Sequence, residues 1–266
     1  MTSTDQDQAE SPADDIWGAR AGDYAELDEG QNRQLFEEGV RLTGTGPGTA
    51  LLDLGCGPGA FCRLAADAGA AVTGLDSSPA MLELARRRVP EGRFDLGDIQ
   101  ALHYPDDSFD VVTAFHSLMF AADPVAALAG ARRVARPGGT LLVLVFGREE
   151  RIELAAKWRA LGRLLPPTAS GPPDPLALSR PGVLEEMTGR AGLEVTDAGY
   201  VEGRFEFPDE ATMLRAQRST PMALLAERVA GKPAVNQAIV DAFAPCRTSS
   251  GGYRIEFESR WLKARA

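Results

Sequence analysis

The chain has 266 residues, 44% of them hydrophobic, and carries a formal net charge of -10 at pH 7. This length allows a substantial core, so we expect one domain with an elaboration and not two full domains. The acidic balance argues against nucleic acid or an anionic membrane as a partner, and no apolar stretch is long enough to span a membrane.

The cysteine spacing and the N-terminal sequence bear on metal binding and on the cellular compartment. Cys56, Cys62 and Cys246 show neither metal-ligand spacing nor an even disulfide set, and the chain has only two histidines. These counts argue against a metal site. The N-terminus lacks the charged-then-apolar pattern of a signal peptide, so the simplest expectation is a protein of the reducing cytoplasm.

The first part of the chain predicts a tail followed by helices. Residues 1–14 are polar, acidic and without periodicity, which predicts disorder. Trp17 and Tyr24 follow in a polar stretch. They either pack an N-terminal helix against a sheet or form a lid over a ligand cleft, with the Tyr24 hydroxyl available to a ligand. Residues 31–43 predict an amphipathic helix, and residues 44–48 a linker.

A glycine turn comes next, and the rest of the chain is organised around it. The apolar run 50–54 breaks into Gly55, Cys56 and Gly57, and an Ala/Leu-rich helix is expected over residues 60–68. Strand, tight glycine turn and helix form the first unit of a nucleotide-type α/β domain. Without a Cβ, glycines can take positive φ and let the backbone approach a ligand closely.

The glycine spacing and one carboxylate indicate the kind of ligand. The pattern is G-x-G-x-G, not the G-x-G-x-x-G that seats a pyrophosphate on a helix N-terminus. Asp53, just before the turn, would oppose a phosphate and attract an ammonium. We therefore expect a nucleoside ligand with a zwitterionic tail and no phosphate. A purely structural turn is the alternative.

Two further strands are each followed by an acidic residue. The strand at residues 70–76 ends in Asp76, a carboxylate suited to ribose hydroxyls, and Ser77 follows it before the helix at residues 79–88. A turn or capping role for Asp76 is the alternative. The third strand begins at residue 93 and leads to a second acidic turn.

That second turn contains Asp98 and Ile99. Asp98 could accept a hydrogen bond from an exocyclic adenine amine, while Ile99 covers the ring face. An ordinary turn aspartate beside a glycine is the alternative.

The remaining apolar runs define the sheet. Residues 109–115 and 140–146 read as the fourth and fifth strands, separated by a helix and the turn at residues 137–139. Continuous apolar runs suit strands buried on both faces, and alternating helices predict a doubly wound parallel sheet. Right-handed crossovers then place every turn described above at one edge of the sheet.

The segments LDLGCGPG, GLDSSPAML, GDIQALHYPDDSFD, VVTAFHSLMF and RPGG occur in this order. Together they resemble the Rossmann-like class I S-adenosylmethionine-dependent methyltransferases, small-molecule type with an Asp-x-Gly-x-Gly motif, over about residues 45–147. The resemblance implies S-adenosyl-L-methionine as cofactor and S-adenosyl-L-homocysteine as product. By position, the residues implied to contact the cofactor are Gly55, Cys56 and Gly57 at the methionine part, Asp76 with the adjoining Ser77 at the ribose, Asp98 and Ile99 at the adenine, Met81 near the adenosine, and Phe115 beneath the sulfonium.

The C-terminal half predicts the sixth and seventh strands and a helical insertion. We expect a helix at residues 149–165, a mobile loop or gate at 166–175, and a helix capped by Ser179. The sixth strand is expected at residues 192–207 and a helical cap insertion at 209–246. The resemblance implies that the last strand is antiparallel and lies between the fifth and sixth, which gives the order 3-2-1-4-5-7-6. The predicted domains are the tail 1–14, a helical lid 15–48, the core 49–208 with 247–266, and the cap 209–246.

His116, directly after the fourth strand, is the candidate general base, because histidine titrates near neutral pH. The alternative is a histidine that only shapes the pocket. We expect methyl transfer to a small-molecule acceptor, with no nucleic acid and no membrane as partner, by a monomer or homodimer. The alternatives are an S-adenosylmethionine-binding cyclase or sensor and, with less support, a nicotinamide-dependent oxidoreductase.

Overall fold

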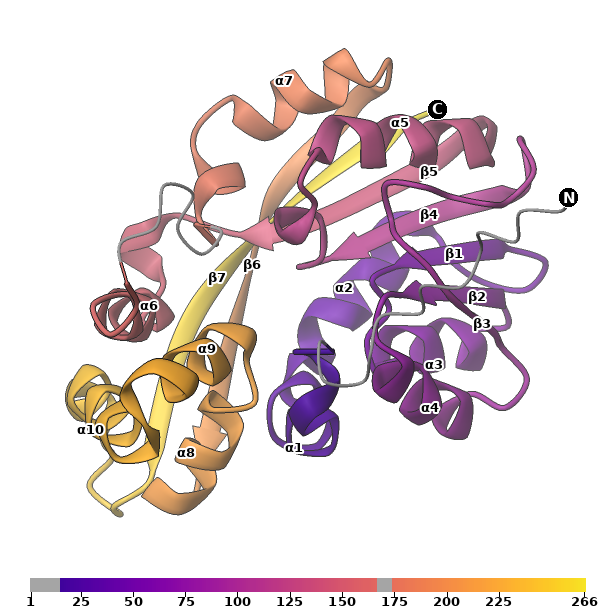
Figure 1. Ribbon diagram of the computed structural model, residues 1–266. Helices are drawn as coiled ribbons and strands as arrows, with labels where there is room; N and C mark the ends of the chain where they lie inside the picture. The colour runs from indigo at the N-terminus through magenta and orange to yellow at the C-terminus, as the bar shows by residue number, and fades with distance from the viewer. Residues whose placement is uncertain (1–14, 167–173) are drawn as a thin grey trace, which may run out of the picture.

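The computed structural model describes residues 15–166 and 174–266. A seven-stranded sheet runs through the molecule in the order β3-β2-β1-β4-β5-β7-β6 (Figure 1). The strands are β1 (Ala50–Leu54), β2 (Ala71–Asp76), β3 (Arg93–Leu96), β4 (Phe109–Phe115), β5 (Ala135–Phe146), β6 (Glu194–Phe207) and β7 (Tyr253–Arg265). The pairs among β1 to β5 are parallel, and β7 is antiparallel to both β5 and β6. The predicted fold class and strand order are confirmed.

Helices cover both faces of this sheet, as a doubly wound fold requires. α5 and α7 pack on one face, while α2, α3 and α4 pack on the other. The side chains of β5 alternate accordingly, since Val143 faces the α5 and α7 side and Leu144 the opposite side. The helices of these two layers are α2 (Arg33–Thr43), α3 (Ala60–Asp67), α4 (Pro79–Arg88), α5 (Pro124–Val134) and α7 (Val183–Arg190).

A second group of helices gathers around the ends of the long strands β6 and β7 (Figure 1). It comprises α6 (Leu154–Gly162), α8 (Glu210–Gln217), α9 (Pro221–Ala230) and α10 (Lys232–Ala242). α1 (Ala21–Leu27) contacts both α8 and α4, so it joins this group to the sheet layers. The predicted helices at residues 209–244 are thus present, and the division into lid, core and cap domains stays a prediction.

Two local predictions need correction. The turn at residues 137–139 does not precede the fifth strand but lies inside it, because the pairing of β4 with β5 shifts register there and Gly138 takes a φ of 78°. Ser179 does not cap α7. The N-cap is Gly182, with a φ of 82°, and the Ser179 hydroxyl donates to the carbonyl of Phe146 instead.

Some predictions fall on segments that the structure leaves out. The expected disordered tail at residues 1–14 and most of the expected loop at 166–175 lie outside the described residues. Among the helices of the described ranges, each is too short or too polar to cross a lipid bilayer.

Candidate functional site

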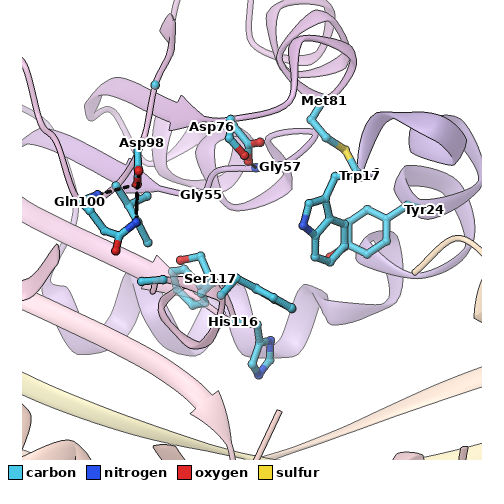
Figure 2. Close-up of a pocket in the computed structure, with 16 residues that line it drawn as sticks. Trp17, Tyr24, Gly55, Gly57, Asp76, Met81, Asp98, Gln100, His116 and Ser117 are labelled. Atoms are coloured by element: carbon cyan, nitrogen blue, oxygen red, sulfur yellow. Dashed lines mark hydrogen bonds between the residues drawn. The ribbon is translucent and has the colours of Figure 1, made fainter. Parts of the chain in front are cut away.

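A cleft with a cavity volume of about 160 Å³ opens at the carboxyl ends of β1 to β4. In Figure 2, Asp98 and Gln100 lie on one side of the glycine turn, and Trp17 and Tyr24 on the other. In doubly wound folds, ligands bind at this edge, in the crevice formed by the loops that follow the carboxyl ends of the strands. The cleft is lined by Trp17, Tyr24, Gly55, Gly57, Asp76, Ser77, Met81, Gly97, Asp98, Ile99, Gln100, Phe115, His116, Ser117, Phe120 and Ala121.

The glycine turn after β1 approaches the cleft without side chains. Gly55 and Gly57 have φ angles of 71° and 52°, in the left-handed region that favours glycine. A Cβ on Gly55 would lie 2.4 Å from the Ser117 Cβ, whereas a Cβ on Gly57 would meet nothing closer than the Glu29 Oε1, at 3.8 Å. Packing therefore requires the first glycine, and the second leaves room for a ligand.

Asp76 ends β2 with its carboxylate on the cleft wall. It accepts hydrogen bonds from the backbone N–H groups of Gly57 at 2.8 Å and Ser78 at 2.9 Å. Burial raises the pKa of Asp76, and these two bonds oppose that shift. Because each carboxylate oxygen has two lone pairs, acceptor capacity is left for a ligand hydroxyl.

The turn after β3 presents a carboxylate and an amide. The Asp98 Oδ1 accepts from the backbone N–H of Gln100 at 2.8 Å, and the Gln100 Nε2 donates to the same carboxylate at 3.1 Å (Figure 2). Gln100 in turn accepts from the backbone N–H of Asp123 at 2.7 Å, which ties this turn to the start of α5. The sequence analysis missed Gln100, although an amide two residues after a turn aspartate is a usable signal.

Aromatic side chains from the N-terminal segment close one side of the cleft. Trp17 makes edge contacts with Tyr24 at 5.6 Å and with Phe120 at 5.2 Å between ring centroids. Burial, aided by Asp28 and Glu29, raises the pKa of Tyr24 well above its usual value, so its hydroxyl stays protonated. The structure brings Trp17, Tyr24 and the expected Met81 to one cleft, and it adds the unexpected Phe120.

A buried carboxylate that sequence reasoning missed lies at the N-terminus of α3. The Glu29 Oε1 accepts from the backbone N–H of Ala60 at 3.0 Å, and its other oxygen pairs with Arg88. Burial raises the pKa of Glu29 to about 7, and Arg88 opposes this shift. In dinucleotide-binding folds a pyrophosphate takes such a helix N-terminus. Here a carboxylate occupies it, which disfavours a phosphate-bearing ligand.

A second cavity of about 330 Å³ adjoins the cleft, and we call it the acceptor chamber. Four residues line both spaces: Trp17, Tyr24, His116 and Phe120. The chamber wall is mainly aromatic and aliphatic, with a few polar groups. Its other lining residues are Ile16, Asp28, Asn32, Met119, Phe146, Leu154, Lys157, Trp158, Pro175, Phe205, Thr220, Pro221, Met222, Leu225 and Phe257.

Comparison with known proteins decides the family. A family model described as a methyltransferase domain matches residues 52–143. A malonyl-acyl-carrier-protein O-methyltransferase of Erwinia pyrifoliae is 33% identical over 196 residues, which cover 73% of this chain and 68% of the relative. The chain belongs to the class I S-adenosylmethionine-dependent methyltransferases.

Other relatives of this methyltransferase family match shorter stretches. A malonyl-acyl-carrier-protein O-methyltransferase of Serratia marcescens is 40% identical over 124 residues, 46% of this chain and 49% of the relative. A demethylmenaquinone methyltransferase of Renibacterium salmoninarum is 41% identical over 120 residues, 45% of this chain and 51% of the relative. The chain thus spans about half the length of these curated relatives.

Solved structures support the methyltransferase fold. An S-adenosylmethionine-dependent methyltransferase from Thermotoga maritima superposes with a TM-score of 0.55 at 16% identity, covering 94% of this chain and 98% of that one. The 4+2 cyclase SpnF gives a TM-score of 0.57 at 22% identity, covering 87% and 80%. At these identities the likeness concerns the fold alone.

Two expected contacts of the methyltransferase site need correction. Asp53 is 2% exposed and does not line the cleft, because its Oδ1 accepts from the Thr113 hydroxyl at 2.7 Å on the neighbouring strand. Burial raises the pKa of Asp53 to about 7, and its bonds to Thr113 and Cys62 oppose the shift. The Cys56 side chain is also buried, and it too lies off the cleft wall, packed beside Gly74.

His116 occupies the junction of the two cavities with both its backbone and its ring constrained. Its φ of 50° is unusual for a residue other than glycine. The ring shares a hydrogen bond with the Ser259 hydroxyl at 2.9 Å and stacks on Phe146 at 4.6 Å. Burial lowers the pKa of His116 to about 4. This arrangement argues against the general-base hypothesis and favours the alternative, a histidine that shapes the pocket.

Proposed function

We propose that the chain is an S-adenosylmethionine-dependent methyltransferase that transfers a methyl group to a small apolar metabolite and leaves S-adenosylhomocysteine. The observation that carries this proposal is the wall shared by the cleft and the acceptor chamber, made by Trp17, Tyr24, His116 and Phe120. A cofactor in the cleft and an acceptor in the chamber would meet at these side chains. In-line transfer depends on such a meeting, because the reacting atoms have to be held close and aligned.

The residues of the cleft fit the cofactor. A Cβ on Gly57 would enter open space beside the turn, so the backbone there can lie against a ligand. Asp76 would hold the ribose, and Asp98 with Ile99 the adenine. Glu29 supports a cofactor without phosphate, because its carboxylate already occupies the N-terminus of α3. Its carboxyl oxygens beside the turn can also accept hydrogen bonds from the ammonium end of a methionine tail.

When bound, S-adenosylmethionine supplies an electrophilic methyl group. The protein then has to orient the acceptor toward this methyl group and exclude water from the site. Trp17 and Phe120 meet edge to face at the junction of the two cavities, and Phe115 also lines the cleft. His116 stays neutral at physiological pH, because its pKa of about 4 lies far below that range. So low a pKa also makes His116 a weak base, which favours a role in shaping the wall over removal of a proton from the acceptor.

The acceptor class follows from the chamber and not from the relatives. The matched relatives are named for a malonyl carrier protein and for demethylmenaquinone, so their names agree on methyl transfer but differ in the acceptor. The chamber, at about 330 Å³ with a mostly apolar wall, suits a small ring-sized acceptor. The net charge of -10 supports a metabolite over nucleic acid.

Two measurements test this proposal. Calorimetric titration should detect binding of S-adenosylhomocysteine and no binding of reduced nicotinamide dinucleotide. Incubation with S-adenosylmethionine labelled in its methyl group and a panel of ring-sized apolar acceptors should move the label to one of them. Binding without transfer to any acceptor would favour a cyclase or sensor, and binding of the dinucleotide alone would overturn the proposal.

A further inference from the structure

The apolar acceptor chamber has a small polar group buried in its wall. Asp28, Asn32 and Lys157 line it, and Gln217 lies directly behind Lys157. Their exposed fractions are 9%, 7%, 2% and 0%. Asp28 and Asn32 come from the end of α1 and the 3-10 helix that follows it directly (Glu29–Asn32), and Lys157 and Gln217 come from α6 and α8. Three separate parts of the chain thus bring polar groups to one place. Side chains of this kind are rarely buried unless they have partners.

The hydrogen bonds of this cluster are incomplete. The Lys157 Nζ donates to the Gln217 Oε1 at 2.7 Å, and within the described residues this is its one hydrogen bond, although an ammonium carries three donors. The Asn32 Oδ1 is buried without a donor in the same part of the chain. Two donors on Lys157 are therefore available to a molecule in the chamber.

Asp28 and Lys157 carry opposite charges on one wall and influence each other without touching. Burial raises the pKa of Asp28 to about 6 and lowers that of Lys157 to about 8, and each group opposes the other's shift. Both therefore remain charged at neutral pH. Among the described side chains, no N···O distance of 4.0 Å or less joins the two groups. Two unpaired buried charges are costly, so a polar group between them would be favourable.

We propose that Lys157 and Asp28 together bind one hydroxyl group of a flat apolar methyl acceptor of the phenol or enol class. This inference rests on the proposed function, because it names the acceptor of that same site. A hydroxyl can accept from the Lys157 ammonium and donate to the Asp28 carboxylate at once. A carboxylate or an ether cannot donate to Asp28, and an ammonium cannot accept from Lys157.

The body of the acceptor follows from the rest of the wall. Phe146, Trp158, Phe205 and Phe257 all line the chamber, and aromatic rings favour stacked or edge contacts with a flat ring. Lys157 and Asp28 do not line the cofactor cleft. The hydroxyl that they bind is thus an anchor, and a different atom of the acceptor lies at the shared wall to receive the methyl group.

Three bicyclic probes that share one ring system test the anchor. We would measure the affinity of 2-naphthol, 2-methoxynaphthalene and 2-naphthoate by calorimetry, with and without S-adenosylhomocysteine. Wild-type protein should bind 2-naphthol about tenfold more tightly than either other probe, the ratio expected for a hydrogen bond to a charged group. Equal binding of all three probes would overturn the inference.

Variants on the chamber wall separate the anchor from general packing. Lys157→Met and Asp28→Asn should each remove most of the preference for 2-naphthol. Leu225→Met, a change of similar volume on the same wall, should keep it. Affinity for S-adenosylhomocysteine and the melting temperature confirm that each variant is folded. A Lys157→Met protein that keeps the full preference would overturn the inference.

The same titrations distinguish failure of the inference from failure of the proposed function. Wild-type protein that does not bind S-adenosylhomocysteine but prefers 2-naphthol contradicts the methyltransferase proposal and supports the Lys157 anchor. Protein that binds S-adenosylhomocysteine and shows no preference among the probes contradicts the anchor alone.

Discussion

Two glycines in the turn after β1 are required for different reasons. Gly55 is held by packing, since a Cβ there would lie 2.4 Å from the Ser117 Cβ. Gly57 has open space on the side where a Cβ would point, so a side chain there would compete with a ligand and not with the protein. The structure thus separates a residue needed for folding from a residue needed for binding, although both belong to one sequence motif.

A matched pair of alanine variants tests the role of Gly57. Gly57 and Gly44 have similar φ angles of 52° and 66°, and neither has a close neighbour where a Cβ would lie. Each change to alanine should cost about 1–2 kcal/mol in stability, the penalty of the left-handed conformation. Only Gly57→Ala should weaken S-adenosylhomocysteine binding, by about tenfold or more. Calorimetry and thermal denaturation measure both effects, and unchanged affinity in Gly57→Ala would contradict the assignment.

The acidic residue beside the turn shows where sequence reasoning fails at this scale. From its place just before the glycine turn, Asp53 is predicted to attract the ammonium of the ligand. Asp53 lies in a strand buried on both faces and pairs in register with Thr113, so its side chain bonds across the sheet. Glu29 supplies the carboxylate at the turn. It comes from a segment whose position depends on tertiary packing and not on local pattern.

At the scale of elements, α2 is a supporting layer under the cleft. Its Gly39 faces Phe115, and a Cβ there would lie 2.4 Å from the Phe115 Cζ. Phe115 also contacts Phe61 at 4.3 Å and Phe36 at 5.4 Å between ring centroids, and it lines the cleft. Packing of α2 therefore fixes the position of a ring expected beneath the cofactor.

Alanine at Gly39 should destabilise the protein although alanine favours helices. The overpacked Phe115 ring should cost about 1–3 kcal/mol, more than the gain of up to about 1 kcal/mol from helix propensity. Gly189 in α7 has nothing within 4 Å of a Cβ, so Gly189→Ala should be neutral or slightly stabilising. Urea denaturation of the two variants provides the test. A Gly39→Ala protein more stable than wild type would show that Phe115 is not confined.

An arginine–glutamate cluster joins the N-terminal segment to the helices near the C-terminus. Arg20 donates to the Arg218 carbonyl at 2.8 Å and to the Glu227 Oε1 at 3.1 Å, and Arg218 also pairs with Glu227. The pKa of Glu227 is lowered to about 2, because the bonds from Arg20 and Arg218 outweigh the opposing effect of burial. Trp17, at the junction of the cavities, lies directly before the 3-10 helix that contains Arg20.

Removing Arg20 should therefore affect both stability and binding. Arg20→Ala should cost about 1–2 kcal/mol, less than a fully buried pair because Arg20 is 24% exposed. It should also weaken S-adenosylhomocysteine binding several-fold. Arg41→Ala breaks the exposed pair with Glu38 and should change stability by about 0.5 kcal/mol or less. Equal effects of the two variants in denaturation and calorimetry would argue against a joining role for Arg20.

At the scale of the whole molecule, the sheet was predictable and the acceptor chamber was not. β1 and β4 coincide with the apolar runs at residues 50–54 and 109–115, because strands buried on both faces have a continuous apolar pattern. The chamber is assembled from residues such as Asp28, Lys157 and Phe257, which lie far apart in the chain. Each is ordinary in its local context, so no local pattern indicates that they share one cavity.

The molecule also buries carboxyl groups, which links its stability to pH. Burial raises the pKa of Asp28 to about 6 and those of Glu29 and Asp53 to about 7. In the unfolded chain these groups titrate near pH 4. Between those values the folded state holds more protons than the unfolded state, so stability falls as pH rises. The contribution of these protonated carboxyl groups to the free energy of unfolding is fully present below about pH 4. It is lost as pH rises through 6 to 7.

Asp53→Asn isolates one of these groups. The amide oxygen can still accept from Thr113, but the side chain no longer titrates. Wild-type stability from urea denaturation should fall between pH 5 and pH 7, with Asp53 contributing about 2 kcal/mol of that fall. The Asp53→Asn slope should be shallower, while Asp241→Asn, an exposed change on α10, should keep the wild-type slope. Parallel curves for wild type and Asp53→Asn would mean that Asp53 is already ionised in the folded state at pH 5. The hydrogen bonds from Thr113 and Cys62 would then lower the pKa of Asp53 by more than burial raises it.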